Sequence, residues 1–240
     1  MNGLILSSYL AQSGVGSRRA CEHVITAGHI EVNGGVVVAL NTFVDPKTDR
    51  VSYNGQPLRI QKKRYLLLHK PKGYTCSSKD KHADKLVSDI LRPPPKERLF
   101  TVGRLDKNSE GLLLLTNDGQ FAQLISHPRF NVRKTYLVTV KGNITSSGMH
   151  QLENGFMDNG EFLKAINAKI IAPRPNGGTL QIIVAEGRKR EIRRMCQRLN
   201  YKVQRLIRTT IGPIKLGTFR PGYYREPSPK EVGLLRKVTE

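Results

Sequence analysis

The chain has 240 residues, which is enough for one large domain or two modest ones. It carries 40 Lys and Arg against 19 Asp and Glu, a formal net charge of +21, and 38% of its residues are hydrophobic. This composition excludes a disordered acidic chain, a collagen-like chain and a disulfide-rich miniprotein. The apolar runs are too short to span a membrane, and residues 1–6 lack the basic start of a signal peptide.

The cysteine and histidine spacings carry no metal or disulfide signature. Cys21, Cys76 and Cys196 lie at least 55 residues apart, and none belongs to a C-x-x-C pair. This usage predicts a reduced, cytoplasmic protein without disulfides. The six histidines have no neighbours at metal-ligand spacing, so we expect no metal site.

The N-terminal segment predicts a small module of two helices and hairpins. Residues 4–11 read as a short helix, which Gly14 to Gly16 ends. Ser17 suits the N-cap of a second helix that begins at Arg18. Asn33-Gly34 and Asn54-Gly55 are typical turns of tight hairpins.

This module resembles the S4 RNA-binding domain. The resemblance rests on Ser17-Arg18-Arg19-Ala20 and on the stretch from Ala27 to Gly34. It implies that Ser17, Arg18 and Arg19 contact RNA, and helix-start N–H groups would add to the attraction of Arg18 and Arg19 for a phosphate. A solvated helix start is the alternative. Residues 1–60 carry a net charge of only +1, so we expect the module to orient RNA more than to attract it.

Nearly all of the positive charge lies in the rest of the chain. Residues 61–240 contain 35 basic and 15 acidic residues. A polyanion is the natural partner of such a field. Nucleic acid is favoured over a membrane surface, because no stretch combines a basic face with a large apolar one. The alternative is a basic protein whose charge serves solubility alone.

The second part of the chain reads as a sheet-rich domain. Residues 57–64 read as a linker, which predicts domains at 1–60 and 61–240. Short strands are predicted at residues 65–68, 99–105, 112–116, 135–140 and 180–184. Helices are predicted at residues 120–126 and around Ile192, Met195, Cys196 and Leu199. Many strands with few helices indicate an α+β fold.

Asp106 is the most unusual residue of the basic domain. It follows a predicted strand, between Arg104 and Lys107, and nearby cations favour its charged form. An ionised carboxylate repels phosphate, so it serves either as the partner of an arginine or as a nucleophile or base. The residues alone favour the structural role, because ion pairs are commoner than active sites.

Two further segments suit RNA. Residues 186–208 hold nine basic and two acidic residues, and Gly187 leads a basic loop into the start of a helix. Such a loop is a plausible phosphate-binding device, and a solvated helix face is the alternative. Tyr136 lies on a predicted strand flanked by basic residues. It either stacks on an unstacked RNA base or belongs to the core.

Together these segments resemble the pseudouridine synthases of the RsuA/RluB family. The motifs occur in order as His69 to Gly73, Gly103 to Gly119, Glu186 to Met195 and Arg205 to Pro213, behind an S4 module. The resemblance covers about residues 3–235. It implies a catalytic domain on a mixed, largely antiparallel sheet flanked by helices. It also implies conversion of a specific uridine in ribosomal RNA to its C5-glycoside isomer, pseudouridine.

The resemblance also implies roles for individual residues. Asp106 matches the essential nucleophile or base on the sugar, Arg193 its basic partner, and Tyr136 the residue that stacks under the uracil. Leu206 matches an apolar residue of the pocket, and Arg104 is expected to hold the flipped-out nucleotide. The residues expected to position phosphates are Lys70, Lys72, Arg188, Lys189, Arg190 and Arg194. An isomerisation needs no cofactor, in agreement with the absence of dinucleotide and P-loop motifs.

Glu191 departs from the family pattern, because many relatives carry Gln there, and we expect it to pair with a neighbouring Arg. Together with residues 205–208 it favours the large-subunit (23S) rRNA branch over the small-subunit (16S) branch. We expect a cytoplasmic monomer that binds ribosomal RNA and no membrane. The alternatives are a non-catalytic RNA-binding or ribosome-assembly protein and, less favoured because paired half-site features are absent, a DNA-binding regulator.

Overall fold

The computed structural model describes residues 3–77 and 83–237 and divides the chain into two compact units. The first unit comprises Met1–Arg64 and Pro95–Leu99, and the second comprises Tyr65–Pro94 and Phe100–Glu240. The short segment at 95–99 belongs to the first unit although it lies within the second in sequence. An ion pair at 3.7 Å between Arg64 and Glu97 lies inside that first unit.

The helices of the first unit follow from its capping and apolar residues. They are α1 (Leu6–Gln12) and α2 (Arg18–Thr26). The Oγ of Ser17 accepts a hydrogen bond from the backbone N–H of Ala20 at 3.2 Å, so Ser17 caps α2 as predicted. The first helix begins two residues later than predicted, because Leu4 and Ile5 pair as a short strand with Phe43 and Val44.

The strands of the first unit form a small sheet in the order β3-β2-β5-β6. Their bounds are β2 Ile30–Val32, β3 Gly35–Val36, β5 Val51–Tyr53 and β6 Gln56–Pro57, beside the β1 (Leu4–Ile5) and β4 (Phe43–Val44) pair. Asn33 and Asn54 adopt left-handed backbone conformations, with φ of 53° and 49°. Both predicted hairpin turns are therefore confirmed.

The second unit is built on a sheet of nine strands. The continuous order is β13-β14-β10-β15-β9-β7-β17, with β16 added to β15 and β8 to β9. The bounds are β7 Tyr65–Lys70, β8 Phe100–Val102, β9 Glu110–Thr116, β10 Lys134–Lys141, β13 Asn167–Arg174, β14 Gly177–Val184, β15 Lys202–Ile211, β16 Ile214–Lys215 and β17 Tyr224–Arg225. Among these described strands only β9 and β15 pair in parallel, which confirms the predicted mixed, largely antiparallel sheet.

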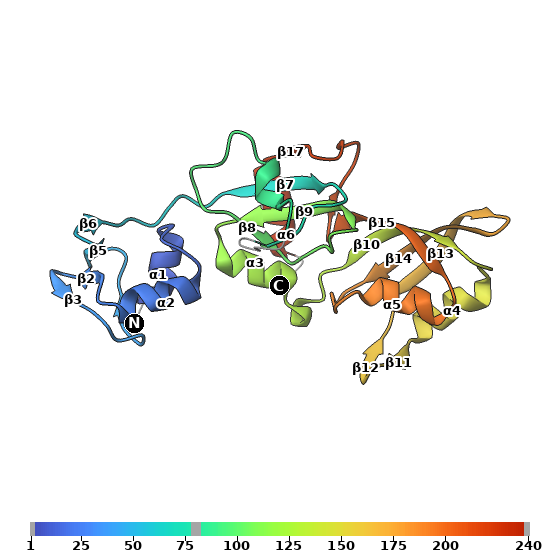
Figure 1. Ribbon diagram of the computed structural model, residues 1–240, viewed down its shortest axis with the longest axis horizontal. Helices are drawn as coiled ribbons and strands as arrows, with labels where there is room; N and C mark the ends of the chain where they lie inside the picture. Colours follow the sequence, from blue (N-terminus) through green and yellow to red (C-terminus); the bar gives the residue numbers. More distant parts are fainter. Residues whose placement is uncertain (1–2, 78–82, 238–240) are drawn as a thin grey trace. The chain divides into compact units, whose positions relative to one another are not determined.

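Helices flank this sheet, as Figure 1 shows. They are α3 Gly119–Ser126, α4 Ser146–Asn154, α5 Glu191–Arg198 and α6 Pro229–Lys237, with short 3-10 turns at Val87–Ile90 and Pro128–Phe130. A separate hairpin of β11 (Phe156–Asp158) and β12 (Glu161–Leu163) lies near α5. The sequence predicted α3 and α5 but not α4, α6 or the hairpin, whose apolar residues are too few to set a period.

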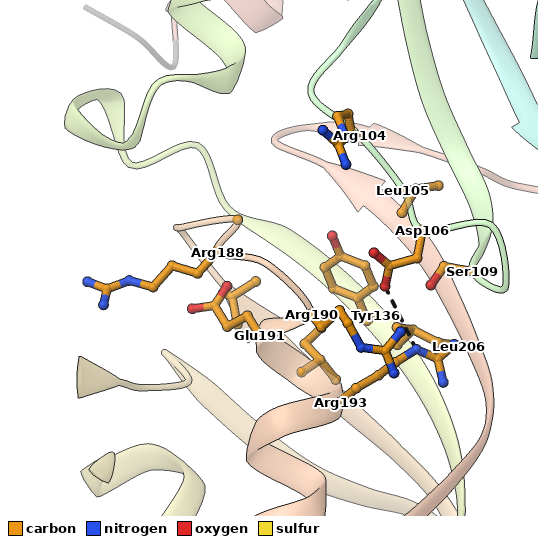
Figure 2. Close-up of a pocket in the computed structure, with 13 residues that line it drawn as sticks. Arg104, Leu105, Asp106, Ser109, Tyr136, Arg188, Arg190, Glu191, Arg193 and Leu206 are labelled. Carbon is orange, nitrogen blue, oxygen red and sulfur yellow. Dashed lines mark ion pairs between the residues drawn. The ribbon is translucent and has the colours of Figure 1, made fainter. Parts of the chain in front are cut away.

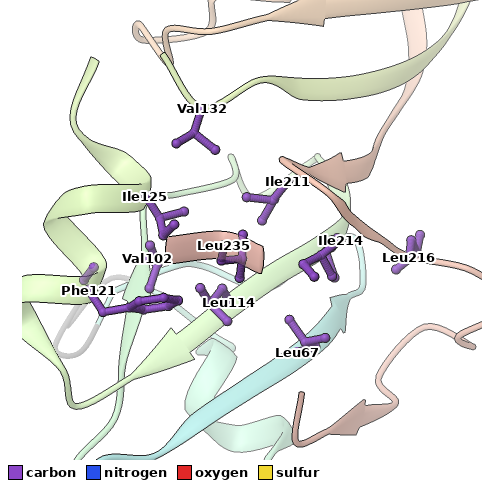
Figure 3. Close-up of a cluster of buried hydrophobic side chains, with 12 residues drawn as sticks. Leu67, Val102, Leu114, Phe121, Ile125, Val132, Ile211, Ile214, Leu216 and Leu235 are labelled. Atoms are coloured by element: carbon purple, nitrogen blue, oxygen red, sulfur yellow. The ribbon is translucent and has the colours of Figure 1, made fainter. Parts of the chain in front are cut away.

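A core between α3 and the β7–β9 part of the sheet supports the site. Figure 3 shows Phe121 and Ile125 of α3 facing Leu114 of β9 and Leu67 of β7, all at most 2% exposed. Burying each such side chain stabilises the fold by roughly 1.5–3 kcal/mol. The packing of α3 against the apolar run of β9 therefore fixes the position of β9, the strand that follows Asp106.

Gly111 allows β9 and β15 to approach closely. Its φ of 110° is one that L side chains rarely adopt, and a Cβ there would lie 2.3 Å from the Arg208 carbonyl oxygen. Only glycine fits this position without moving the backbone. The close approach brings the loop before β9, which contains Asp106, against the middle of the sheet.

Candidate active site

A pocket of about 70 Å³ opens between the loop before β9, the strands β10, β14 and β15, and the start of α5 (Figure 2). Seven of the predicted site residues line it: Arg104, Asp106, Tyr136, Arg188, Arg190, Arg193 and Leu206. The rest of the lining is Leu105, Ser109, Val184, Gly187, Glu191 and Ile192. Segments up to about 100 residues apart in sequence thus meet around one carboxylate.

Asp106 and Arg193 form an ion pair in this pocket. The Arg193 Nε lies 3.8 Å from the Asp106 Oδ2, and the two side chains are 14% and 35% exposed. The Nη2 of Arg193 donates a hydrogen bond of 2.9 Å to the carbonyl oxygen of Asn108. Burial lowers the pKa of Arg193, but a guanidinium remains cationic at any physiological pH. Arg193 therefore holds both the carboxylate and the loop that carries it.

Tyr136 and Leu206 form the apolar wall of the pocket. Tyr136 of β10 is 8% exposed and Leu206 of β15 is 5% exposed, and the two strands pair with Val138 opposite Leu206. Figure 2 shows the Tyr136 ring beside the Asp106 carboxylate. Tyr136 is thus both a core residue and a pocket residue. A planar base entering the pocket would find an aromatic face next to the carboxylate.

The prediction that Lys70 positions a phosphate is wrong. Lys70 is fully buried, and its Nζ donates hydrogen bonds to the carbonyl oxygens of Ser109 (2.8 Å), Pro71 (3.0 Å), Asp106 (3.2 Å) and Lys107 (3.4 Å). Its ammonium is therefore hydrogen-bonded within the protein and is not available to a phosphate. Burial lowers the pKa of Lys70. Lys70 holds the loop of residues 106–109 in place through hydrogen bonds to its carbonyl oxygens.

The prediction that Arg194 positions a phosphate is also wrong. Its guanidinium pairs with the carboxylates of Asp158 and Glu161, and its Nη2 donates a hydrogen bond of 2.7 Å to the Asp158 carbonyl oxygen. Charge-assisted bonds to two carboxylates leave it little attraction for RNA. Together with the buried Ile192 and Met195, this anchor fixes the rotation of α5 so that Arg193 points at Asp106.

The expected ion pair of Glu191 is not formed. Glu191 is 5% exposed, and no Lys or Arg of residues 3–77 or 83–237 comes within 4 Å of its carboxylate. Burial raises its pKa to about 7, and the negative charge of Glu186 adds to the shift. Helix α5 instead turns its side chain into the pocket wall, where Figure 2 shows it apart from Arg193.

Replacing Glu191 by Gln should stabilise the second unit only at higher pH. The folded-state pKa of Glu191 is raised from 4.5 to about 7, so its ionisation lowers stability as pH rises through that window. Glu191→Gln should therefore gain up to about 3 kcal/mol at pH 8 and almost nothing at pH 4. Urea unfolding at both pH values measures this, and a gain of equal size at pH 4 and pH 8 would contradict it.

The remaining predicted residues lie outside the centre of the pocket. Arg188 pairs with Glu186, and in Figure 2 its side chain points away from Asp106. Lys72 and Lys189 are exposed and do not line the pocket.

In the first unit, Arg18 and Arg19 are exposed at the start of α2. The hydroxyl oxygen of Ser17 accepts the capping bond, and contact of this exposed residue with RNA stays a prediction.

Ser109 is a pocket residue that sequence reasoning missed. Its Oγ is buried and, within the described part of the chain, has no hydrogen-bond partner. The Nε of Arg193 is likewise buried and has no hydrogen-bond partner among the described residues. Buried polar atoms without partners are uncommon, and both of these belong to residues that line the pocket. In the sequence, Ser109 looks like any polar turn residue before a strand.

The described residues contain no group of three or more His, Cys, Asp or Glu side chains arranged to hold a metal ion. No helix among them is both long and apolar enough to cross a membrane.

The fold and the pocket define a nucleic-acid-modifying enzyme with an attached RNA-binding module. Residues 64–198 match the RNA pseudouridylate synthase family, and residues 6–51 match the S4 domain. The chain belongs to the RNA pseudouridylate synthase family. It is therefore an enzyme that converts uridine in RNA to pseudouridine.

Similar proteins match along nearly the whole chain. A protein of Aquifex aeolicus described as an uncharacterized RNA pseudouridine synthase is 39% identical, over 97% of this chain and 94% of its own. The ribosomal large subunit pseudouridine synthase B of Bacillus subtilis is 34% identical, over 98% of this chain and 96% of its own. A crystal structure of a pseudouridylate synthase has a TM-score of 0.68 at 27% identity, covering 96% of this chain and 98% of its own.

Proposed function

We propose that this protein isomerises one specific uridine of large-subunit ribosomal RNA, with Asp106 as the essential catalytic group. The observation that carries the proposal is the Asp106–Arg193 pair beside Tyr136 and Leu206, in one pocket of a strongly basic domain. The choice of large-subunit RNA is supported by the likeness to the Bacillus subtilis enzyme, which is 34% identical over 98% of this chain.

The reaction rearranges bonds within one nucleotide. The N1–C1′ bond of uridine breaks, the uracil turns while it stays in the pocket, and a C5–C1′ bond forms. The C5 proton leaves and N1 ends protonated, so atoms and electrons balance without an oxidant or group acceptor. The pocket must therefore hold a detached base and protect the reactive sugar from water.

The pocket residues divide this work. Asp106 acts on the sugar as nucleophile or base, and Arg193 holds its carboxylate in position. Tyr136 supports the uracil ring, Leu206 closes the apolar side, and Arg104 holds the flipped-out nucleotide. Exposed basic residues guide the RNA backbone: Lys72, Lys189 and Arg190 in the second unit, and Arg18 and Arg19 in the first.

We also propose that the protein works as a monomer in the cytoplasm. The support for the cytoplasm is chemical: all three cysteines are free and buried, as in proteins of a reducing compartment.

Mapping of pseudouridine in both ribosomal RNAs tests the proposal. Cells lacking this protein should lose the signal at one uridine of the large-subunit RNA and regain it when the wild-type protein is restored. Loss at a small-subunit uridine instead would correct the target, and unchanged maps of both RNAs would contradict the function.

Neutralising Lys189 and Arg190 should weaken RNA binding and flatten its salt dependence. Both side chains are exposed, and neither has an ion-pair partner in the described ranges. Losing two phosphate contacts should reduce the slope of log affinity against log salt by roughly 1.4–1.8. Filter binding of Lys189→Gln/Arg190→Gln at several salt concentrations measures it. Lys169→Gln/Arg174→Gln on β13 removes the same charge away from the pocket, and an equal change there would contradict the assignment.

A further inference from the structure

A second, larger hollow adjoins the catalytic pocket. Its volume is about 360 Å³, against about 70 Å³ for the pocket around Asp106. The hollow and the pocket share part of their lining, because Arg190 and Arg193 border both. The other lining residues come from the end of α5 and the start of β15: Gln197, Asn200, Tyr201, Lys202 and Val203.

The lining of this hollow combines a buried tyrosine and a half-buried valine with a polar rim. Tyr201 is 5% exposed, and its hydroxyl packs against α4. A Cβ added to Gly148 of α4 would lie 2.0 Å from that hydroxyl oxygen. The ring is therefore fixed before anything binds. Val203 lies next to it in the lining.

The rim offers unused hydrogen-bonding groups. Gln197, Asn200 and Lys202 are exposed, and none of these side chains has a hydrogen-bond or ion-pair partner in the part of the chain that the structure describes. The turn that presents them is held by bonds from Asn200 N to Gln197 O (3.0 Å) and Tyr201 N to Cys196 O (2.8 Å). No carboxylate occurs among the described lining residues, so the local charge is positive.

We propose that this hollow binds the base of a nucleotide next to the target uridine in the RNA strand, which rests on the proposed function. A uridine that leaves its stack for the Asp106 pocket leaves its neighbours without a stacking partner. The exposed amide groups at the edge of this hollow suit an unstacked base, because every base has a hydrogen-bonding edge. Arg190 and Arg193 lie where the phosphate between the two nucleotides would pass.

The binding of this flanking base contributes to the choice of target. The amides of Gln197 and Asn200 can donate and accept, and the Lys202 ammonium only donates. A base that presents acceptors toward Lys202 is therefore preferred at this position. The neighbouring nucleotide then influences which uridine reaches Asp106, although it takes no part in the reaction.

Steady-state kinetics on a stem-loop transcript test the proposal, using the uridine found by mapping and the full-length protein. Gln197→Ala/Lys202→Ala should raise KM on the order of tenfold, because two hydrogen-bonding groups are lost, and leave kcat within twofold. The matched control is Lys169→Ala/Gln181→Ala, a register pair on β13 and β14 outside both hollows, which should change neither constant by more than twofold.

Abasic RNA identifies what the hollow holds. Transcripts lacking one base at each flanking position are compared with the complete RNA. At one position the missing base should raise KM for the wild type but add nothing for Gln197→Ala/Lys202→Ala, because the contact is already lost.

Two outcomes overturn the inference while the proposed function stands. One is a wild type that makes pseudouridine and a double variant that equals its control. The other is a set of abasic penalties that add to those of the variant at every position, which would mean that no base occupies the hollow. A wild type that makes no pseudouridine in the mapped RNA contradicts the proposed function itself, and the flanking site with it.

Discussion

Replacing Asp106 by Asn should abolish pseudouridine formation and leave RNA binding close to that of the wild type. The amide has nearly the same shape as the carboxylate but can neither attack the sugar nor accept a proton. Arg193 also loses its charged partner, at present 3.8 Å away. We expect the rate to fall on the order of 10⁴-fold.

RNA affinity should stay the same or rise slightly in this variant. The substitution removes one negative charge from a pocket that must accept a polyanion, and the basic residues that guide the backbone are untouched. Filter binding measures affinity, and nucleoside analysis of digested RNA measures the product. The two readouts separate an enzyme from a non-catalytic RNA-binding protein with the same fold.

Asp84 offers a matched control for the Asp106 substitution. Asp84 pairs with Lys107 of the same loop at 3.2 Å, but its side chain is 83% exposed and does not line the pocket. Asp84→Asn makes the same chemical change beside the same loop and should keep activity within about twofold, since exposed pairs contribute little. Turnover by Asp106→Asn at a similar level would show that Asp106 is not the catalytic carboxylate.

Replacing Lys70 by Met should unfold or loosen the active site. The ammonium is fully buried and supports four carbonyl oxygens, three of them in the loop of residues 106–109. Methionine has a similar length but no donor, so buried acceptors lose their partner. We expect the free energy of unfolding to fall by about 3–5 kcal/mol and kcat to fall with it.

Lys72 provides the comparison that separates the two roles of a lysine in this segment. It lies two residues later and is exposed, so Lys72→Met removes the same charge without a buried bond. Its stability should change by less than about 0.5 kcal/mol, and its effect should appear as weaker RNA binding. Urea unfolding and filter binding of both variants test this. A stable Lys70→Met protein with weakened RNA binding would restore the phosphate role first predicted for Lys70.

Local patterns in the sequence were sufficient for much of the fold. Asn-Gly turns specify hairpins because asparagine and glycine tolerate positive φ, and Ser17 caps a helix because its hydroxyl oxygen reaches a free N–H. The apolar stripe of α5 and the buried run of β9 follow from helix and strand periods. The order of the motifs then indicated the family, and with it Asp106 as the catalytic candidate.

The partners of charged residues were the part that sequence could not supply. Lys70, Arg194 and Glu191 all lie in motifs rich in basic residues, where a phosphate contact or a pair with Arg is the natural expectation. Arg194 instead meets Asp158 and Glu161, more than 30 residues away, on a hairpin whose existence the sequence did not indicate. Linear neighbours do not determine which charges meet in space.

The sequence by itself determined a basic RNA-binding chain of α+β type, its S4 module, and the loop, strand and helix that carry Asp106, Tyr136 and Arg193. These follow from local periodicity, turn residues and charge, which act over a few residues. Only the tertiary structure decided that Lys70 clamps the catalytic loop, that Glu191 is buried without forming an ion pair among the described residues, and that a second hollow adjoins the pocket. Burial and long-range pairing decide these features, because desolvation depends on every segment that packs around a group.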